Sequence, residues 1–477
     1  MSDHIASPSV VSPHPVPAPP LFDSFWPKPD TGAPRALLAA LISGLAAAVF
    51  LPLEGPGIGW TLFGAITTAA LLFAVRDAGT ARLLWAATGA LLLTVCALRS
   101  AEWLAALCVL TSAVAAALAI TGARAVRELV LMTVAVPIAA CRALPWAARG
   151  MRGRLRGSRA LRMALSVLVA LALLLIFGAL FSGADENFAR IADAVMPELD
   201  FETFFRATFV FGPFTLLALG AAFTALRPPR LDPPAEQRRT LRGPEWAIPI
   251  GVLVALFALF IVVQAASLFG GPAHVRDSAG LTFSAYARSG FWQLTLVTIL
   301  TLPVIAAAAR WAPKRTTAER NLLRGLAGAL AVLTLVIVGS ALARMVAYQD
   351  AYGYTVLRLL VMTCEIWLGV VYAMIIAAGL RLRAHWLPTA VLATAMGALL
   401  ALAALNPEGA VAGANVTRFE QTGKIDPEYL ATLSPDALPA IDRLPTDLKH
   451  SIVADINADA DELGWRSWNL TTHLTRP

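Results

Sequence analysis

Three segments of the sequence place aromatic residues beside an arginine, directly before or at the start of a long apolar run. They are Phe205-Arg206, Tyr286-Ala-Arg288, and Tyr352-Gly-Tyr354 followed by Arg358. Planar guanidinium groups bind phosphate or carboxylate in a bidentate manner, and aromatic rings provide a stacking wall, so this combination can form an anion site. It can equally anchor helix ends in the membrane interface, where aromatic rings and arginines contact lipid headgroups.

One acidic residue, Glu365, lies inside an apolar run, seven residues into residues 359–379. At 1.5 Å per residue this is about 10 Å from the start of the run. A carboxylate at that depth is costly unless it faces protein or water. Arg358 lies two turns away on the same face, but its side chain leans toward the helix N-terminus, so no direct ion pair is expected. Glu365 can carry a proton in coupled transport or make a structural hydrogen bond to a neighbouring span.

Two adjacent acids, Asp185 and Glu186, follow the apolar run 163–182. They can act as a base or as metal ligands in a membrane glycosyltransferase that uses a lipid-linked sugar, an analogy that rests on the expected fold alone. They can also cap a helix end. The glycosyltransferase is the alternative to the non-enzymatic functions considered below.

The other side chains show no pattern typical of an enzyme or a metal centre. The sequence contains no Walker loop, no GxGxxG motif after a strand, no HExxH and no GxSxG. The four cysteines lie in apolar runs without a CxxC pair, and the six histidines are scattered singly. We therefore predict no catalytic residue, no cofactor and no bound metal.

Composition indicates which class of protein positions these residues. The 477 residues are 58% hydrophobic and 14% charged, with a mean hydropathy of +0.68. Soluble domains average about 45–50% apolar and about 25% charged residues, so ordinary soluble enzymes, disordered chains and disulfide scaffolds are excluded. The net charge of +7 is spread over loops between apolar runs, which argues against a nucleic-acid-binding surface. The sequence predicts a multi-pass membrane protein.

Eleven apolar runs approach the length of about 20 mostly apolar residues that a spanning helix needs. We expect an all-α transmembrane bundle with spans at residues 36–53, 56–74, 83–98, 103–120, 163–182, 207–226, 247–270, 291–309, 325–343, 359–379 and 387–405. The stretch 129–141 is shorter, contains Pro137 and is flanked by arginines. We expect it to lie at the interface or to re-enter the membrane.

The distribution of basic residues predicts the orientation. If the N-terminus is inside, the inner loops hold 23 Lys and Arg residues and the outer loops hold 7. Such a bias over short loops favours an N-inside, C-outside topology. The inner loop 142–162 contributes seven arginines and no acid. It can act as a topology determinant and can also bind anionic lipid headgroups.

The chain divides into five regions in this interpretation. Residues 1–34 form a disordered, proline-rich cytoplasmic tail, 35–122 a four-span half, 123–162 the interfacial segment and Arg-rich loop, 163–405 a seven-span domain, and 406–477 a helical extracytoplasmic tail. Within that last region, helix starts are signalled at Asn406-Pro407, Asp426-Pro427, Ser434-Pro435 and Pro445-Thr446. Three to five short helices are therefore expected.

The predicted outer tail carries a net charge of −5, whereas the outer loops present arginines. Opposite charges at a partly dehydrated surface attract, so we expect the tail to dock on the loops that contain Arg206, Arg288, Arg344 and Arg358. A ligand or partner site is predicted at this outer face, close to Arg288, Arg344, Arg358, Arg418 and Asp436. A mobile tail that recruits an envelope protein is the alternative.

Six sequence strings in succession carry a family resemblance. They are FSGADENF at 181–188, YARSGFWQL at 286–294, the segment 344–358, NVTRF at 415–419, the segment 426–439, and WRSWNL at 465–470. This succession resembles the bacterial membrane family known as domain of unknown function 4173, with its relative 4153, over residues 165–475. The resemblance implies a polytopic protein of the bacterial inner membrane and supplies no catalytic residue.

These features predict an inner-membrane protein that works as a transporter or as an envelope sensor or scaffold, and we do not expect an enzyme. A transporter should place Glu365 on a polar path beside Gln264 or Ser340, whereas a scaffold should have a closed apolar core. The expected partners are the bilayer, anionic headgroups at residues 142–162, and an envelope protein at the outer face. No nucleic-acid partner is expected.

Overall fold

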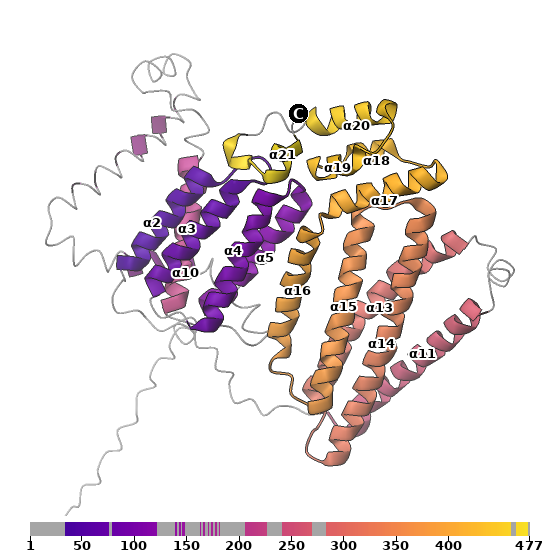
Figure 1. Ribbon diagram of the computed structural model, residues 1–477. Helices are drawn as coiled ribbons and strands as arrows, with labels where there is room; N and C mark the ends of the chain where they lie inside the picture. The colour runs from indigo at the N-terminus through magenta and orange to yellow at the C-terminus, as the bar shows by residue number, and fades with distance from the viewer. Residues whose placement is uncertain are drawn as a thin grey trace, which may run out of the picture.

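The computed structural model describes residues 34–75, 79–121, 206–226, 241–269, 283–458 and 464–475, with scattered residues between 139 and 181. The described residues form long helices that run side by side, and short helices cover one end of this bundle (Figure 1). No strand occurs in this part of the chain. The expected all-α bundle is confirmed. We call the covered end the tail face and the other end the opposite face.

Two groups of long helices make up the bundle. The first contains α2 (Pro34–Phe50), α3 (Ile58–Val75), α4 (Thr80–Leu98), α5 (Glu102–Thr121) and α10 (Gly212–Leu226), which continues the short π-helix η1 (Arg206–Phe211). The second contains α11 (Gly243–Phe269), α13 (Phe283–Trp311), α14 (Thr317–Tyr352) and α15 (Val356–Arg381). Helix α16 (Leu387–Ala404) packs against α15 and α4 and so joins the two groups (Figure 1).

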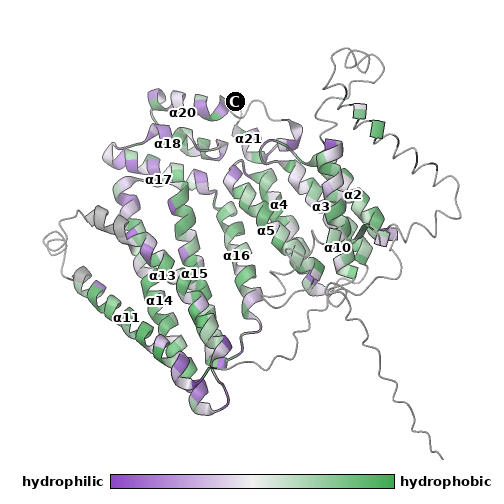
Figure 2. Cartoon of the chain, turned by 180° about the vertical axis from the view of Figure 1, so that it is seen from behind, coloured by the Kyte–Doolittle hydropathy of each residue, from purple (hydrophilic) through white to green (hydrophobic). Residues whose placement is uncertain are grey.

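The predicted spans agree with these helices. Nine helices in the described residues are long and apolar enough to cross a membrane, and α2 is an apolar helix of 17 residues. Figure 2 shows hydrophobic residues along the long helices and polar residues at their ends and in the tail. The eleventh predicted span, residues 163–182, and the stretch 129–141 lie mostly outside the described residues. The protein is a multi-pass membrane protein.

Helix α14 is longer than its predicted span, residues 325–343. It begins at a capping box, in which the Thr316 side chain accepts a hydrogen bond from the Glu319 amide and Glu319 bonds back to the Thr316 amide. It ends before Gly353, whose φ is 87°. The helix therefore reaches 36 residues and continues beyond the apolar run at both ends.

Small residues allow the helices of the first group to approach closely. Helix α2 buries a face that contains Ala36, Ala40, Gly44 and Ala47. A Cβ placed on Gly44 would lie 1.8 Å from Thr215 Oγ1 of α10. Faces of small residues are the usual way in which membrane helices pack, because burial in lipid provides no hydrophobic driving force between them.

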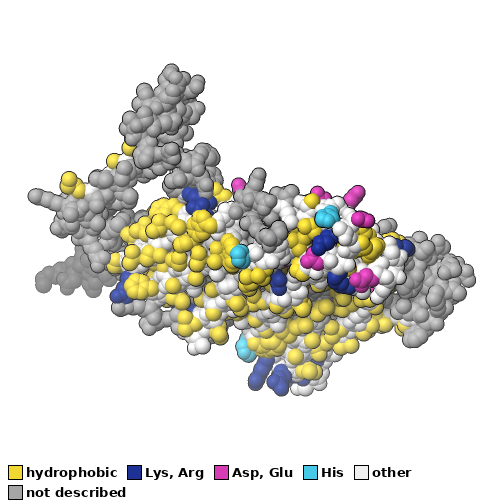
Figure 3. Space-filling view, turned by 45° about the horizontal axis from the view of Figure 1, so that its top comes forward, with side chains coloured by type: hydrophobic (Ala, Val, Ile, Leu, Met, Phe, Trp, Pro, Cys, Tyr) yellow, Lys and Arg dark blue, Asp and Glu magenta, His cyan; other side chains and the backbone are white. Residues whose placement is uncertain are grey.

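The tail covers one end of the bundle with short helices. They are α17 (Pro407–Thr422), α18 (Pro427–Ala431), η2 (Pro435–Ala437), α19 (Leu438–Ile441), α20 (Thr446–Ala458), η3 (Trp465–Ser467) and α21 (Leu470–Thr475). All four predicted helix starts are confirmed. A separate small core forms around Ala412, Val416, Leu430, Ile441 and Ile452. Charged side chains of both signs lie over this end, above the hydrophobic flanks of the long helices (Figure 3).

Candidate functional site

At the tail face of the second group, α13, α14 and α15 line a cavity of about 260 Å³. Its wall combines two arginines and three aromatic side chains with a few smaller residues: Arg344, Arg358, Phe291, Trp292, Tyr348, Met345, Thr355, Leu357 and Val361. The structure thus brings two of the five predicted site residues together. We call this cavity the arginine pocket.

Arg358 is held in place by the end of α14. Its guanidinium carbon lies 4.4 Å from the centre of the Tyr348 ring, which is a cation–π distance. It donates hydrogen bonds to the Tyr348 hydroxyl at 3.3 Å and to the Gly353 carbonyl oxygen. The backbone of Arg358 is fixed as well, because its amide donates to the side chain of Thr355, the N-cap of α15. A guanidinium has five N–H donors, so some remain for a ligand in the pocket.

Arg344 packs against α13 at Gly290. A Cβ on Gly290 would lie 2.3 Å from Arg344 Nη1, so the end of the Arg344 side chain rests against the open space that this glycine leaves. Arg288, the third predicted site residue, precedes Gly290 by two positions on α13, and its side chain lies outside the described residues.

The loop between α14 and α15 connects the arginine pocket to the tail. Gly353 adopts a φ of 87°, and a Cβ there would lie 3.0 Å from Asn415 Oδ1. Asn415 of α17 accepts from the Tyr354 amide at 3.0 Å and donates to the Tyr354 carbonyl at 2.8 Å. Arg418, the fourth predicted residue, donates to the Ala351 carbonyl at 2.9 Å. It therefore closes the end of α14 beside the pocket and does not line it.

Two tyrosine hydroxyls support this connection. Burial and the neighbouring Asp350 carboxylate raise the pKa of the Tyr354 hydroxyl, which donates to Asp350 at 2.9 Å. Burial also raises the pKa of Tyr429, whose hydroxyl accepts from the Val356 amide at 2.7 Å. Both groups therefore stay neutral at physiological pH. The Tyr354 hydroxyl ties the loop to the end of α14, and the Tyr429 hydroxyl ties the start of α15 to α18.

Asp436, the fifth predicted residue, lies at another place, at the turn between α4 and α5. Its side chain is only 1% exposed. Oδ2 accepts hydrogen bonds from the amides of Ser100 at 2.9 Å and Ala101 at 3.1 Å, directly before α5. Oδ1 lies 4.0 Å from Arg99 Nη1. A carboxylate at this position satisfies amides at the start of a helix, so Asp436 fastens the tail to the first group.

Two neighbours of Asp436 extend this contact. Glu408 of α17 accepts from the Trp103 indole at 2.8 Å and from the Ser434 amide at 2.6 Å. Arg99 donates to the carbonyl oxygens of residues 403 and 404, at 2.9 and 3.2 Å, which end α16. The buried acids Glu408 and Asp436 and the partly exposed Arg99 together form a polar cluster that we call the tail clamp. It joins the tail, α16 and the turn between α4 and α5.

The end of the tail lies on the first group. Ile58 donates its amide proton to the Trp468 carbonyl at 2.8 Å, and the Thr471 hydroxyl donates to the Leu98 carbonyl at 2.8 Å. The docking expected of the tail is thus observed, but its basis differs from the expectation. Among the described residues, most tail contacts run to backbone groups, and the ion pair between a loop arginine and a tail acid is that of Arg99 with Asp436. Arg206 donates to the Leu51 carbonyl of the loop between α2 and α3.

Glu365 lies inside the second group, on the same face of α15 as Arg358. The two residues are seven positions apart, and Tyr372 follows after seven more, so all three share one face. Glu365 and Tyr372 are both 0% exposed. Neither carboxyl oxygen of Glu365 has a hydrogen-bond partner among the described residues. Thr295 of α13 is close to this carboxyl group, but its hydroxyl donates to the Phe291 carbonyl at 3.3 Å.

Further hydroxyl groups continue from Glu365 into the bundle. Tyr372 donates to the Thr298 carbonyl at 2.5 Å. Buried threonines that donate to their own helices lie on α13 and α14: Thr298, Thr301 and Thr334. Gln264 of α11 bonds to Ser340 of α14, so these two side chains satisfy each other. Within the described residues, Glu365 is thus fully buried at the start of a row of polar groups.

A known protein family matches the part of the chain that contains most of these residues. The family model described as a domain of unknown function, DUF4153, matches residues 86–444 of the 477-residue chain. The chain belongs to this family. No curated protein and no solved structure matches the chain. The DUF4153 region contains the arginine pocket, Glu365 and the tail clamp, and it begins within α4, earlier than the resemblance indicated.

Sequence reasoning missed several residues of this DUF4153 protein. Gly290 gave no signal, because its role depends on a contact with α14. Arg99 was counted only as a basic residue of a short loop, although an outer arginine next to a helix end is unusual enough to suggest a buried partner. Glu408 follows a proline at a helix start, where an acid is expected for the helix dipole alone.

Proposed function

We propose that this protein is a transporter-like bundle of the bacterial inner membrane that binds a small organic anion in the arginine pocket and carries a proton on Glu365. The shared face of α15 supports this function. It presents Arg358 to the pocket, then Glu365, then Tyr372, at intervals of two helical turns. A cation at the entrance and a buried acid about 10 Å deeper are the parts that coupled binding of an anion and a proton requires.

The pocket wall indicates the class of anion. Two guanidinium groups suit a carboxylate or phosphate, and the rings of Phe291, Trp292 and Tyr348 suit a planar group next to it. A cavity of about 260 Å³ holds a small molecule rather than a peptide. The full burial of Glu365 is what an occluded state of an alternating-access cycle would require.

A sensor or scaffold is the second candidate, and the tail clamp favours it. Buried contacts of Asp436 and Glu408 tie the tail to the first helix group, and α17 also packs against α15 of the second, as a docking platform for an envelope partner would require. A Glu365→Gln substitution distinguishes the two functions, because it should stop a transporter and leave a scaffold unaffected. Asp185 and Glu186 of the glycosyltransferase alternative lie outside the described residues, and nothing in the described part favours that enzyme.

The proposed location implies an N-inside, C-outside topology. Helix α2 begins at the opposite face and the tail lies at the tail face, so the described chain starts and ends on different sides of the bundle. An alkaline phosphatase fused after Pro477 should be active, because it would fold outside the cytoplasm. The same enzyme fused after Lys314, at the opposite face, should be inactive. The reverse pair of activities would contradict the topology.

Binding of benzoate to the purified full-length protein tests the anion site. Benzoate combines a carboxylate with a planar ring, and benzamide has the same shape without charge. We expect calorimetry to detect benzoate and not benzamide. The substitutions Arg358→Gln and Arg344→Gln each remove one charge-assisted bidentate contact. Each should weaken benzoate binding at least tenfold.

The matched control for these variants is Arg320→Gln, which removes an exposed arginine from the other end of α14. It should leave benzoate affinity unchanged. Equal affinities for benzoate and benzamide, or equal losses in all three arginine variants, would show that the arginine pocket is not an anion site.

A further inference from the structure

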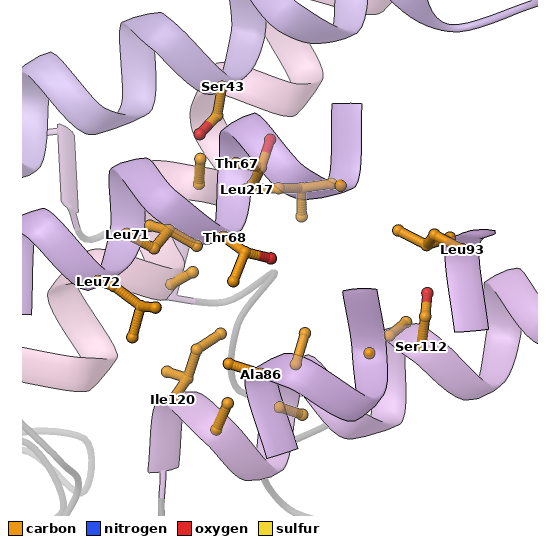
Figure 4. Close-up of a pocket in the computed structure, with 18 of the residues that line it drawn as sticks. Ser43, Thr67, Thr68, Leu71, Leu72, Ala86, Leu93, Ser112, Ile120 and Leu217 are labelled. Carbon is orange, nitrogen blue, oxygen red and sulfur yellow. The ribbon is translucent and has the colours of Figure 1, made fainter. Parts of the chain in front are cut away.

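The first helix group contains a second, larger cavity that the proposed function does not use. It has a volume of about 460 Å³ and lies between α3, α4, α5 and α10, as the close-up in Figure 4 shows. Both Trp60 and Val75 line it, so it follows α3 for 15 residues, or about 22 Å at 1.5 Å per residue. The cavity is thus a slot parallel to the helices, longer than half of the roughly 30 Å hydrocarbon core.

The wall of this slot is almost entirely apolar. Leucine, alanine and aromatic side chains dominate it, and Figure 4 shows a few hydroxyl groups among them. Ser43 and Ser112 donate their protons to their own helices, at 2.8 and 2.7 Å. The buried Thr67 hydroxyl has no hydrogen-bond partner among the described residues. Such a wall suits a hydrocarbon chain and offers no cluster of groups for a polar ligand.

The two ends of the slot differ: α3 and α4 are in contact near the tail face, and an arginine lines the slot at the opposite face. Near the tail face, Thr61 donates to the Leu93 carbonyl at 2.9 Å, and a Cβ on Gly64 would lie 2.3 Å from a Leu93 methyl carbon, so α3 and α4 touch there. At the other end Arg82, in the first turn of α4, belongs to the wall. No ion pair or hydrogen bond of its side chain occurs in the described part of the chain.

A second arginine lies at the same end of α3. The Arg35 guanidinium carbon is 5.5 Å from the centre of the Phe73 ring. The opposite face therefore combines two cations with the mouth of an apolar slot. An anionic headgroup at that interface and an acyl chain in the slot satisfy both features, because basic residues at the membrane surface attract anionic lipids.

We propose that this slot binds one acyl chain of an anionic glycerophospholipid, whose phosphate pairs with Arg82. This site is separate from the arginine pocket and does not depend on the proposed anion transport. The bilayer supplies the ligand at high local concentration. An apolar slot of this size would otherwise stay dry and lose contacts along its whole wall.

Native mass spectrometry of the full-length protein, delipidated and then mixed with phosphatidylglycerol or phosphatidylcholine, tests the site. We expect one tightly held phosphatidylglycerol per chain. Ala86→Phe fills the slot and should reduce its retention at least tenfold, whereas Ala69→Phe, on the exposed side of α3, should not. Arg82→Gln should reduce phosphatidylglycerol retention about fivefold and leave phosphatidylcholine unchanged. Arg310→Gln, an exposed arginine at the same face, serves as its control.

A measurement on the natural protein keeps the test independent of folding defects. Phosphatidylglycerol with a photoreactive group on its acyl chain should label peptides of α3 and α5 that line the slot. Labelling confined to other helices would overturn the proposal. Equal retention of both lipids, or equal retention in the Ala86→Phe and Ala69→Phe variants, would overturn it as well.

Discussion

Glu365→Leu is expected to make the protein more stable and to abolish its function. The carboxyl group is 0% exposed, and neither of its oxygens has a hydrogen-bond partner among the described residues. A buried polar group without a partner costs about 1–3 kcal/mol, so an aliphatic residue of similar size should raise the free energy of unfolding by about that amount. Denaturant unfolding of the purified protein, followed by circular dichroism, measures the change.

Glu365→Gln separates shape from charge at this position. Glutamine keeps the size of the side chain but cannot carry a proton, so it should abolish function without a loss of stability. Glu408→Gln is the matched control, because Glu408 is also buried, at 5% exposure, but both of its oxygens accept hydrogen bonds. That control should destabilise the protein, since one oxygen acceptor becomes an amide donor. A loss of stability in Glu365→Leu would instead identify Glu365 as a structural residue.

Asp436→Ala is expected to detach the tail. It removes one carboxylate that accepts two backbone hydrogen bonds at 2.9 and 3.1 Å in a site with 1% exposure. Hydrogen bonds to charged groups contribute about 1.5–3 kcal/mol each, and the two amides would be left buried without a partner. We expect a loss of about 3 kcal/mol and rapid proteolysis within residues 407–458.

Asp442→Ala provides the control for this experiment. Asp442 is a tail acid with a side chain 63% exposed, and it forms a surface ion pair with Lys449 at 2.7 Å. Such pairs contribute at most about 1 kcal/mol, so the tail should stay docked. If Asp442→Ala and Asp436→Ala gave the same proteolysis pattern, the tail clamp would not be what holds the tail.

Local features of the fold could be predicted because their causes are local. Long apolar runs predict α11 and α15, and Asn406-Pro407 predicts the start of α17, since a capping side chain and a fixed φ act within one turn. The ends of α14 were missed. Its capping box lies among polar residues that hydropathy alone does not assign to the helix.

Most of the candidate site could not be predicted, because its contacts join distant parts of the chain. The prediction placed Asp436 beside the loop arginines on the basis of charge. The Asp436 carboxylate binds the amides of residues 100 and 101 instead. At a helix start, a buried acceptor satisfies amide donors that would otherwise have no partner. By contrast, the absence of an Arg358–Glu365 ion pair in the described residues agrees with the expected direction of the Arg358 side chain.

An anion in the arginine pocket and a proton on Glu365 are expected to bind together. The negatively charged anion favours binding of the proton, and the proton favours binding of the anion. Each must raise the affinity for the other by the same factor. Calorimetric titration of benzoate in two buffers with different ionisation enthalpies, at the same pH, measures the protons taken up on binding. We expect net proton uptake by the natural protein and none by Glu365→Gln, with benzoate still bound by both. The same proton uptake in both proteins would contradict this expectation.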